Sequence, residues 1–186
     1  MAAPEPVLTT SRCVMRLLGA DTLQAYTDYR NRNTAHLAPW EPAPADPLQS
    51  IAQACERSVQ RAMDGHAQGV SVQFVALHPE SGLMLAGCNF TNIVRGPFQA
   101  CHLGYSVDQH WQGKGLAQEV VARGIAYMFD EQRLHRVMAN HMPTNTRSAR
   151  LLQALGFERE GYARAYLQIA GAWEDMVLNA LINPAT

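Results

Sequence analysis

Gln112-Gly113-Lys114-Gly115-Leu116-Ala117 is the stretch that decides the fold, because two different sequence patterns meet on either side of it. Before it, residues 101–107 read Cys-His-Leu-Gly-Tyr-Ser-Val, a short run typical of a β-strand. After it, residues 116–129 form a long run with few helix breakers. The two glycines therefore mark the turn where a strand becomes a helix.

A glycine-rich turn at the start of a helix is suited to binding an anion. The first turn of a helix leaves its N–H groups unpaired, and the helix dipole adds partial positive charge at the same end. Gly113 and Gly115 lack a Cβ atom, so a ligand can approach the backbone closely, and Lys114 adds a positive charge. We predict that this loop holds the pyrophosphate of a nucleotide-like cofactor. The alternative is an ordinary strand-to-helix turn without a ligand.

The composition is that of an ordinary globular protein. We interpret the 186 residues as a single domain, 1–186, whose first ten residues are loosely held. The net charge of −1 provides no overall positive field, so direct nucleic-acid binding is not expected. No apolar run approaches the ~18 residues that a membrane span needs, and the first residues lack the pattern of a signal peptide. We expect a cytoplasmic protein, either a monomer or a homodimer.

The cysteines and histidines do not form a metal-binding pattern. No two cysteines are spaced as C-x-x-C, and the histidines lack metal-ligand spacing, so no metal site is expected. We interpret the thiols as reduced groups, mostly buried, which are Cys13, Cys55, Cys88 and Cys101.

The predicted elements alternate between strands and helices. In chain order they are a strand at 13–18, helices at 21–30 and 48–66, strands at 70–77, 83–94 and 98–107, a helix at 116–129, a strand at 135–142, a helix at 145–155, and strands at 162–169 and 175–182. The strand–helix–strand unit around the glycine loop requires two parallel neighbouring strands. We therefore predict a mixed α/β (α+β) fold with about seven strands and about four helices. The strands ending at Val107 and near Met142 lie side by side in its middle, and the glycine loop follows the first of them, where such sheets bind ligands.

A second motif comes one strand and one helix after the glycine loop. It consists of Asn145-x-x-Ser148 followed by Leu155-Gly156-Phe157. Together with Gln112-x-x-Gly115-x-Ala117, it resembles the motifs of the GNAT acetyltransferases. Longer stretches resemble the RimJ/RimL branch of that family, nearest to its alanine-specific members, from about residue 12 to residue 184. These stretches are 39–42, 89–96, 103–106, 111–116, 135–140 and 160–163.

The resemblance implies the GNAT fold, in which the two parallel middle strands splay apart around the pantetheine arm of acetyl-CoA. Backbone groups of Tyr105, Ser106 and Val107 would pair with that arm, and Asn145 would bind the cofactor near its thioester. The pyrophosphate would be held by the amides of Gln112, Gly113, Lys114, Gly115, Leu116 and Ala117. The implied reaction moves the acetyl group to the α-amino group of an N-terminal alanine on a small-subunit ribosomal protein.

Ser148 is the candidate acid that protonates the leaving thiolate. Many GNAT enzymes use a tyrosine seven positions after the motif asparagine, but that position here is Leu152. In RimL-like enzymes the role is assigned to a serine three positions after the asparagine, and that position is Ser148 here. An alternative is that Asn145 and Ser148 only cap the helix that they begin.

The general base remains open at this point. The glutamate that some relatives place five positions before the motif asparagine corresponds here to Asn140, and the late-hairpin glutamate of RimL-like enzymes has Leu167 nearby in its place. Glu41 is our first candidate, because the proline-rich loop around Trp40 and Glu41 could carry it over the substrate groove. Trp40 is a candidate packing anchor for this loop and also a candidate wall of the substrate groove. His141 and Glu160 are weaker candidates for the base.

Two further functions are compatible with the sequence. One is acetylation of a small-molecule amine, although no acidic cluster surrounds the proposed groove. The other is a non-catalytic module that binds acetyl-CoA or docks on the ribosome, which the missing tyrosine and glutamate would explain. Release of CoA with a matched peptide separates the non-catalytic module from the two enzyme functions.

Overall fold

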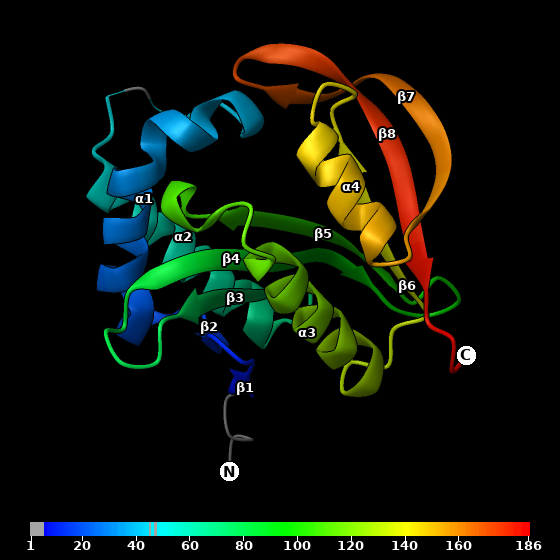
Figure 1. The fold of residues 1–186 in the computed structure, drawn as a ribbon, viewed down its shortest axis with the longest axis horizontal. Helices are drawn as coiled ribbons and strands as arrows, with labels where there is room; N and C mark the ends of the chain where they lie inside the picture. The colour runs from blue at the N-terminus through cyan, green and yellow to red at the C-terminus, as the bar shows by residue number, and fades with distance from the viewer. Residues whose placement is uncertain (1–5, 45, 47) are drawn as a thin grey trace.

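The centre of the molecule is an eight-stranded sheet with the strand order β1-β2-β3-β4-β5-β6-β8-β7 (Figure 1). The computed structural model describes residues 6–44, 46 and 48–186. The strands are β1 (Leu8–Thr9), β2 (Val14–Leu17), β3 (Val72–Leu77), β4 (Met84–Val94), β5 (Ala100–Val107), β6 (Arg136–His141), β7 (Glu158–Ile169) and β8 (Ala172–Ile182). The helices are α1 (Leu23–Leu37), α2 (Ile51–Ala67), α3 (Leu116–Asp130) and α4 (Thr146–Ala154), with 3-10 helices η1 (Ala20–Thr22), η2 (Ala38–Trp40) and η3 (Gln109–Trp111).

The parallel pair of strands, β5 and β6, is hydrogen-bonded over only a short length. Its register runs from Ala100 opposite Arg136 to His102 opposite Met138. Beyond that point β5 follows β4 as far as Val107, while β6 follows β8 as far as His141. The two strands therefore separate at their carboxyl ends, as the family resemblance implies (Figure 1).

The helices cover the two faces of the sheet and create two apolar cores. On one face, α1 and α2 bury a cluster formed by Leu18, Tyr29, Leu37, Val59, Ala62, Val75 and Met84. On the other face, α3 and α4 contribute Val120, Met128 and Leu152 to the larger core. Helix α3 lies close to β4 at Gly124, where a Cβ atom would be 2.9 Å from the sulfur of Cys88. This close contact holds the middle of α3 against the sheet.

Strands β7 and β8 begin earlier than predicted, at Glu158 and Ala172, and two larger differences lie near the N-terminus. Leu8 and Thr9 form an eighth strand, β1, in the segment expected to be loosely held, and Leu8 is buried there. Helix α1 continues beyond residue 30 to Leu37, because the first helix-breaking proline is Pro39, which lies in η2. Residues 1–5, 45 and 47, which the expectations for the terminus and the proline-rich loop also cover, lie outside the described residues. Within the described part of the chain, no helix is both long and apolar enough to cross a membrane.

Candidate functional site

The glycine loop, residues 112–117, lies just beyond the carboxyl end of β5 and leads into α3. Gly113 and Gly115 have φ angles of 70° and 76°, in the left-handed region that strains other residues. A Cβ atom at Gly113 would meet nothing within 4 Å, so a ligand can come close to the backbone there. Gly115 is the N-cap of α3 and brings no side chain over the first-turn amides. These amides are available to an anion.

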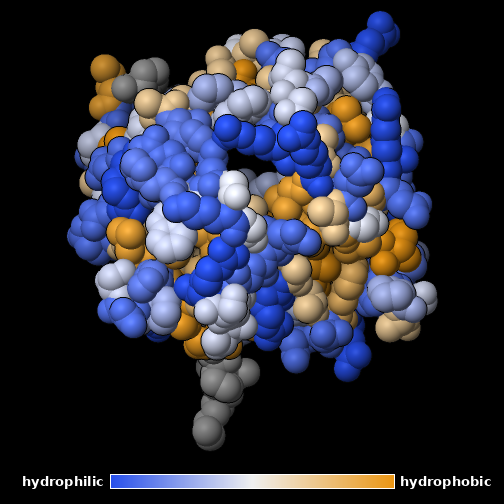
Figure 2. All heavy atoms as spheres, viewed as in Figure 1, coloured by the Kyte–Doolittle hydropathy of each residue, from blue (hydrophilic) through white to orange (hydrophobic). Residues whose placement is uncertain are grey.

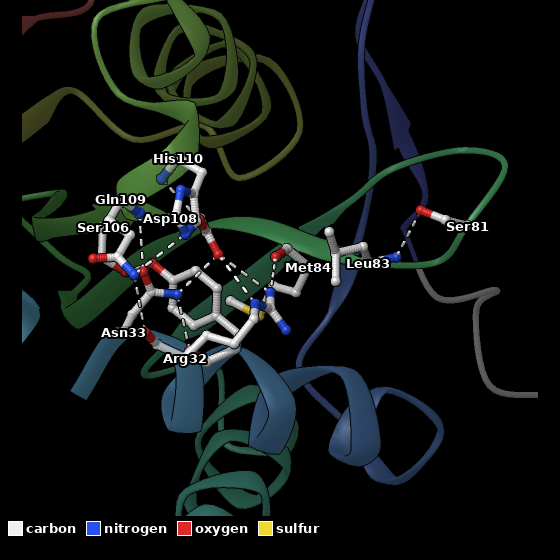
Figure 3. Close-up of polar contacts among 10 residues, drawn as sticks. Arg32, Asn33, Ser81, Leu83, Met84, Ser106, Asp108, Gln109 and His110 are labelled. Carbon is white, nitrogen blue, oxygen red and sulfur yellow. Dashed lines mark hydrogen bonds and ion pairs between the residues drawn. The ribbon is translucent and has the colours of Figure 1, made fainter.

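A buried polar cluster fixes the chain between β5 and the glycine loop (Figure 3). Asp108 is 2% exposed, and its Oδ2 accepts a hydrogen bond of 3.0 Å from Asn33 and bonds of 3.3 Å from Arg32, both on α1. The Oδ1 atom accepts from the His110 N–H at 3.0 Å, and the Asn33 Oδ1 accepts from the Gln109 N–H at 2.9 Å. Burial alone would raise the pKa of Asp108, but the bonds from Asn33, His110 and Arg32 outweigh it and lower that pKa. The carboxylate stays ionised and ties η3 to α1.

A second ion pair holds the glycine loop from the other side. The Arg12 Nη1 donates to the Lys114 carbonyl at 2.6 Å, while its Nε donates to Glu119 Oε2 at 2.6 Å. Glu119 Oε1 also accepts from the Ser11 hydroxyl and the Arg12 N–H. Burial works to raise the pKa of Glu119, but hydrogen bonds from Thr10, Ser11 and Arg12 outweigh it and lower the pKa to about 2. Arg12 and Glu119 therefore link the segment before β2, the loop and the first turn of α3.

Gln112 connects both sides of the site through its side chain. Its Nε2 lies 2.6 Å from His36 Nε2 on α1, and its Oε1 accepts a hydrogen bond from Arg147 on α4. Lys114 turns back toward η3, where its Nζ donates to the His110 carbonyl at 2.9 Å and lies 5.3 Å from the Trp111 ring centre. In this arrangement Arg147 brings a cation to the loop, whereas the Lys114 charge is held against η3.

The gap between β5 and β6 exposes backbone groups of β5. The Asp108 N–H bonds to the Leu85 carbonyl of β4. Because successive residues of a strand point their N–H and C=O groups to opposite sides, the backbone groups of Tyr105 and Val107 point away from β4, into the gap. An extended ligand can pair with them in the manner of an added strand.

The first turn of α4 faces the same gap. Asn145 is the N-cap of α4, and its Oδ1 accepts from the Ser148 N–H at 3.1 Å. The Ser148 Oγ lies 2.7 Å from the Tyr105 hydroxyl, so a hydrogen bond crosses from α4 to β5. The predicted acid and the predicted cofactor strand are thus brought into contact.

An opening passes through the molecule beside this gap, and its rim is mostly hydrophilic (Figure 2). Comparison with Figure 1 places it among α4, the β7–β8 hairpin, the segment after α1 and the end of β5. The Ala170 N–H at the hairpin tip donates to the Glu41 carbonyl at 2.9 Å, which joins the hairpin to the loop after η2. This contact closes the border of the opening on that side.

The Glu41 carboxylate lies beside a small polar cavity on the α1 side of the sheet. Its two oxygens accept from Arg30 at 2.8 and 2.7 Å, and these bonds together with the Glu41 charge raise the pKa of Arg30. The cavity has a volume of about 90 Å³, and its lining includes Glu41, Arg30, Asn89 and Ser106. The space is sufficient for a few water molecules.

These features, a glycine loop on a helix N-terminus next to splayed parallel strands, agree with the comparison to known proteins. The family model described as an acetyltransferase (GNAT) domain matches residues 12–158. The chain belongs to the GNAT acetyltransferase family. It is 43% identical over 181 residues to the [ribosomal protein uS5]-alanine N-acetyltransferase of Escherichia coli (strain K12), which covers 97% of this chain and 93% of that protein.

Solved structures of GNAT enzymes have the same fold. The ribosomal-protein-S5-alanine acetyltransferase from Vibrio fischeri superposes with a TM-score of 0.88 and 36% identity, covering 97% of this chain and 98% of that one. RimJ of Mycobacterium smegmatis, in complex with CoA-disulfide, superposes with a TM-score of 0.86, covering 96% and 88%, and at 24% identity it supports the fold alone. The predicted GNAT fold and the predicted class, an acetyl-CoA-dependent N-acetyltransferase, are confirmed.

The predicted GNAT cofactor residues lie together in one region of the molecule. Tyr105, Val107, the glycine loop and Asn145 surround the gap between β5 and β6. Ser106 differs, because its hydroxyl faces α1 and accepts a hydrogen bond of 2.9 Å from Tyr29. Trp40 is 42% exposed, so its side chain is partly packed and partly open to solvent, and its role as a groove wall stays a prediction.

The weaker candidates for the base are held in other contacts. Glu160 accepts a hydrogen bond from Arg136, and His141 Nδ1 lies 2.9 Å from the Met142 carbonyl.

The Cys101 thiol is buried, which raises its pKa to about 12 and leaves it protonated. Among the residues that the structure describes, no group of three or more His, Cys, Asp or Glu side chains is placed to hold a metal ion.

The supports of the site are absent from the sequence prediction. Arg12 and Glu119 are separated by 107 positions, and Asn33 and Asp108 by 75, so no local spacing connects them. The Tyr105–Ser148 contact spans 43 positions. One signal in the sequence concerns Tyr105. Because side chains alternate along a strand, Tyr105 lies on the same face of β5 as Leu103, and this is the face that α3 and α4 cover.

Proposed function

We propose that this GNAT enzyme transfers the acetyl group of acetyl-CoA to the α-amino group of an N-terminal alanine on a small-subunit ribosomal protein. The choice of an N-terminal alanine as the acceptor rests on the 43% identity, over 97% of the chain, to an enzyme named for that reaction. The proposed acceptor is in keeping with a cytoplasmic location. Acetyl-CoA acts as a cosubstrate, and no metal takes part in the proposed reaction.

The residues around the gap fit acetyl-CoA. The amides of Gln112 to Ala117 would hold the pyrophosphate, and Arg147, which reaches the loop, would add a cation. The backbone groups of Tyr105 and Val107 would pair with the pantetheine arm along the open edge of β5, whereas those of Ser106, predicted to join them, face β4. Asn145 would bind near the thioester from the first turn of α4. When bound, acetyl-CoA supplies an activated carbonyl with a thiol leaving group.

Positioning supplies much of the proposed acceleration. An α-amino group has a pKa of ~7.7–8.0, so a useful fraction is neutral near pH 7 and can attack without a strong base. The Val107 N–H, which points into the gap, would stabilise the oxyanion. Ser148 would protonate the departing thiolate. Direct attack needs no covalent enzyme intermediate, in agreement with the protonated state of Cys101.

Glu41 is the proposed acceptor of the amine proton. Both of its oxygens accept from Arg30, so proton uptake requires the loss of one of these bonds. Waters in the neighbouring cavity would carry the proton from the amine to the carboxylate. Trp40 and Glu41 together would border the acceptor peptide at the loop after η2.

The test is intact-mass analysis of peptides that differ only in their first residue, incubated with the protein and acetyl-CoA. We expect acetylation of the alanine peptide in preference to peptides beginning with a bulky or charged residue. Modification of polyamines or aminoglycosides in place of the peptide would indicate a small-molecule acetyltransferase. Acetyl-CoA binding without any CoA release would indicate a non-catalytic module.

Ser148→Ala tests the proposed acid. We expect kcat to fall by about 10- to 100-fold with little change in acetyl-CoA affinity, because a positioned acid contributes to the transition state rather than to binding. Ser58→Ala is the control. It removes a serine hydroxyl that donates to the Ala54 carbonyl within α2, the helix that packs with α1 on the other face of the sheet. Unchanged turnover of Ser148→Ala would remove Ser148 from this role.

A further inference from the structure

Two hydroxyl groups meet across the gap between β5 and α4. The Tyr105 Oη and Ser148 Oγ atoms are 2.7 Å apart, a short hydrogen-bond distance in which either oxygen can donate. Tyr105 comes from the part of β5 that has separated from β6, and Ser148 comes from the first turn of α4. The contact therefore spans the place where the two halves of the sheet diverge.

Both partners are held in position by other contacts. The Asn145 side chain accepts from the Ser148 N–H, which fixes the first turn of α4. The Tyr105 ring packs against the large apolar core on the α3 side. Because neither group has to be ordered when a ligand arrives, the hydroxyl pair is preorganised on the cofactor face of the gap.

A serine hydroxyl is a poor proton donor by itself. When it protonates a thiolate alone it becomes an alkoxide, which is a much stronger base than the thiolate. A phenol has a pKa of ~10, closer to the ~8.5 of an ordinary thiol, so a tyrosine that donates to the serine places the negative charge on a phenolate instead. The chemistry of a thiol leaving group thus favours a serine backed by a tyrosine.

We propose that Tyr105 is the proton source behind Ser148, and that the two hydroxyls act as a relay. This inference rests on the proposed function of Ser148. As the C–N bond forms and the C–S bond breaks, Ser148 donates its proton to the sulfur and Tyr105 donates its own to Ser148. Tyr105 regains a proton from solvent before the next cycle, and the proton lost by the amine leaves on the Glu41 side, so protons balance over one turnover.

The surroundings of Tyr105 keep its hydroxyl protonated at working pH. Burial raises the pKa of Tyr105, and the hydrogen bond with Ser148 offsets only part of this effect. The group is therefore available as a donor across the neutral range. It acts through Ser148, which makes it a positioning and relay residue.

The first experiment compares Tyr105→Phe, Ser148→Ala and the double variant with the wild-type enzyme. We expect Tyr105→Phe to lower kcat about 10-fold while the Kd for CoA changes less than twofold, and the double variant to be no worse than Ser148→Ala. Tyr127→Phe is the matched control, since it removes a buried tyrosine hydroxyl that accepts from Gln132 in the core. Additive losses in the double variant would overturn the relay.

Two further measurements respond to a relay but not to a merely structural tyrosine. The dependence of kcat on the deuterium fraction of the solvent should be curved for the wild type, with two protons in flight, and straight for Tyr105→Phe. In the complex with CoA, the pKa of the bound thiol, followed by ultraviolet absorbance, should rise by roughly half a unit in Tyr105→Phe, because the thiolate loses support from a polarised Ser148. The same curve shape and the same thiol pKa in both proteins would contradict the proposal.

The outcome for wild-type enzyme separates the two hypotheses. If the wild-type protein releases no CoA with the alanine peptide, the proposed function fails, while the thiol pKa still tests the hydroxyl pair. If the wild type turns over and Tyr105→Phe equals it, the relay fails and the proposed function stands.

Discussion

The proposed cofactor side and the proposed acceptor side of the opening are built differently. On the cofactor side, polar anchors such as Asp108 and Asn33 are buried and fully hydrogen-bonded. On the acceptor side, η2 and the β7–β8 hairpin expose large side chains, among them Trp40 and Trp173. A ligand common to the whole family can be bound by a rigid site. An acceptor that differs among relatives instead meets exposed loop residues, which can change without loss of the fold. Substitutions on the two sides should therefore differ in their effect on stability.

Asp108→Ala should have the largest effect. It removes an ionised acceptor from Arg32 and leaves one of the two N–H groups of the buried Asn33 amide without a partner, so the free energy of unfolding should fall by about 3 kcal/mol. Urea unfolding measures the loss, and CoA affinity should fall with it because η3 loses its attachment to α1. Asp21→Ala is the control, since it breaks the exposed Arg16–Asp21 ion pair and should change stability by less than ~0.5 kcal/mol.

Glu119→Gln should destabilise the protein by about 1–2 kcal/mol at pH 7, because it weakens charged hydrogen bonds to Arg12 and Ser11. The lowered pKa of Glu119 stabilises the fold above the unfolded-state value of ~4.3, and this stabilisation is lost as pH falls toward the folded value of about 2. Thermal melts from pH 5 to pH 2 should therefore show a smaller acid-induced loss in the variant. Equal slopes for both proteins would show that Glu119 makes no such contribution.

Gly115→Ala should cost about 1 kcal/mol of stability, since the residue keeps a φ angle of 76° that alanine adopts with strain. Its effect on CoA binding should be larger, about 10-fold in Kd, because strain and a methyl group at the helix N-terminus move the first amides. Gly69→Ala has a matching φ angle of 69° and open surroundings, so it should show the same strain without the loss of affinity. Isothermal titration with CoA distinguishes the two.

Trp40→Ala should change stability least, by less than ~0.5 kcal/mol, because the side chain is half-exposed. If it borders the acceptor, KM for the alanine peptide should rise several-fold while the Kd for CoA is unchanged. Trp173→Ala, at a more exposed position on the hairpin, serves as the comparison. Identical peptide kinetics in Trp40→Ala and the wild type would remove Trp40 from the acceptor site.

The same contrast explains what could be predicted from the sequence. The glycine loop, the helix after it and the Asn145 cap depend on short-range spacing, so the fold and the places of these two helix N-termini could be predicted, while cofactor binding by their residues stays a prediction. The eighth strand was missed because two residues, Leu8 and Thr9, carry too little alternation to signal a strand. The Arg12–Glu119 and Asn33–Asp108 contacts join distant positions and follow only from the packed sheet. Glu41 was chosen from its loop, and only the structure shows that Arg30 occupies both of its oxygens.

The hydrogen bond from Ala170 to the Glu41 carbonyl has a topological consequence. It closes the space between the loop after η2 and the hairpin, which would otherwise be an open groove, into a ring of chain around the opening. The free end of a polypeptide can pass into such a ring, but a segment in the middle of a folded chain cannot enter it. Discrimination in favour of terminal amines would then precede any recognition of the first side chain, and it would require the acceptor's leading residues to be unfolded when they arrive.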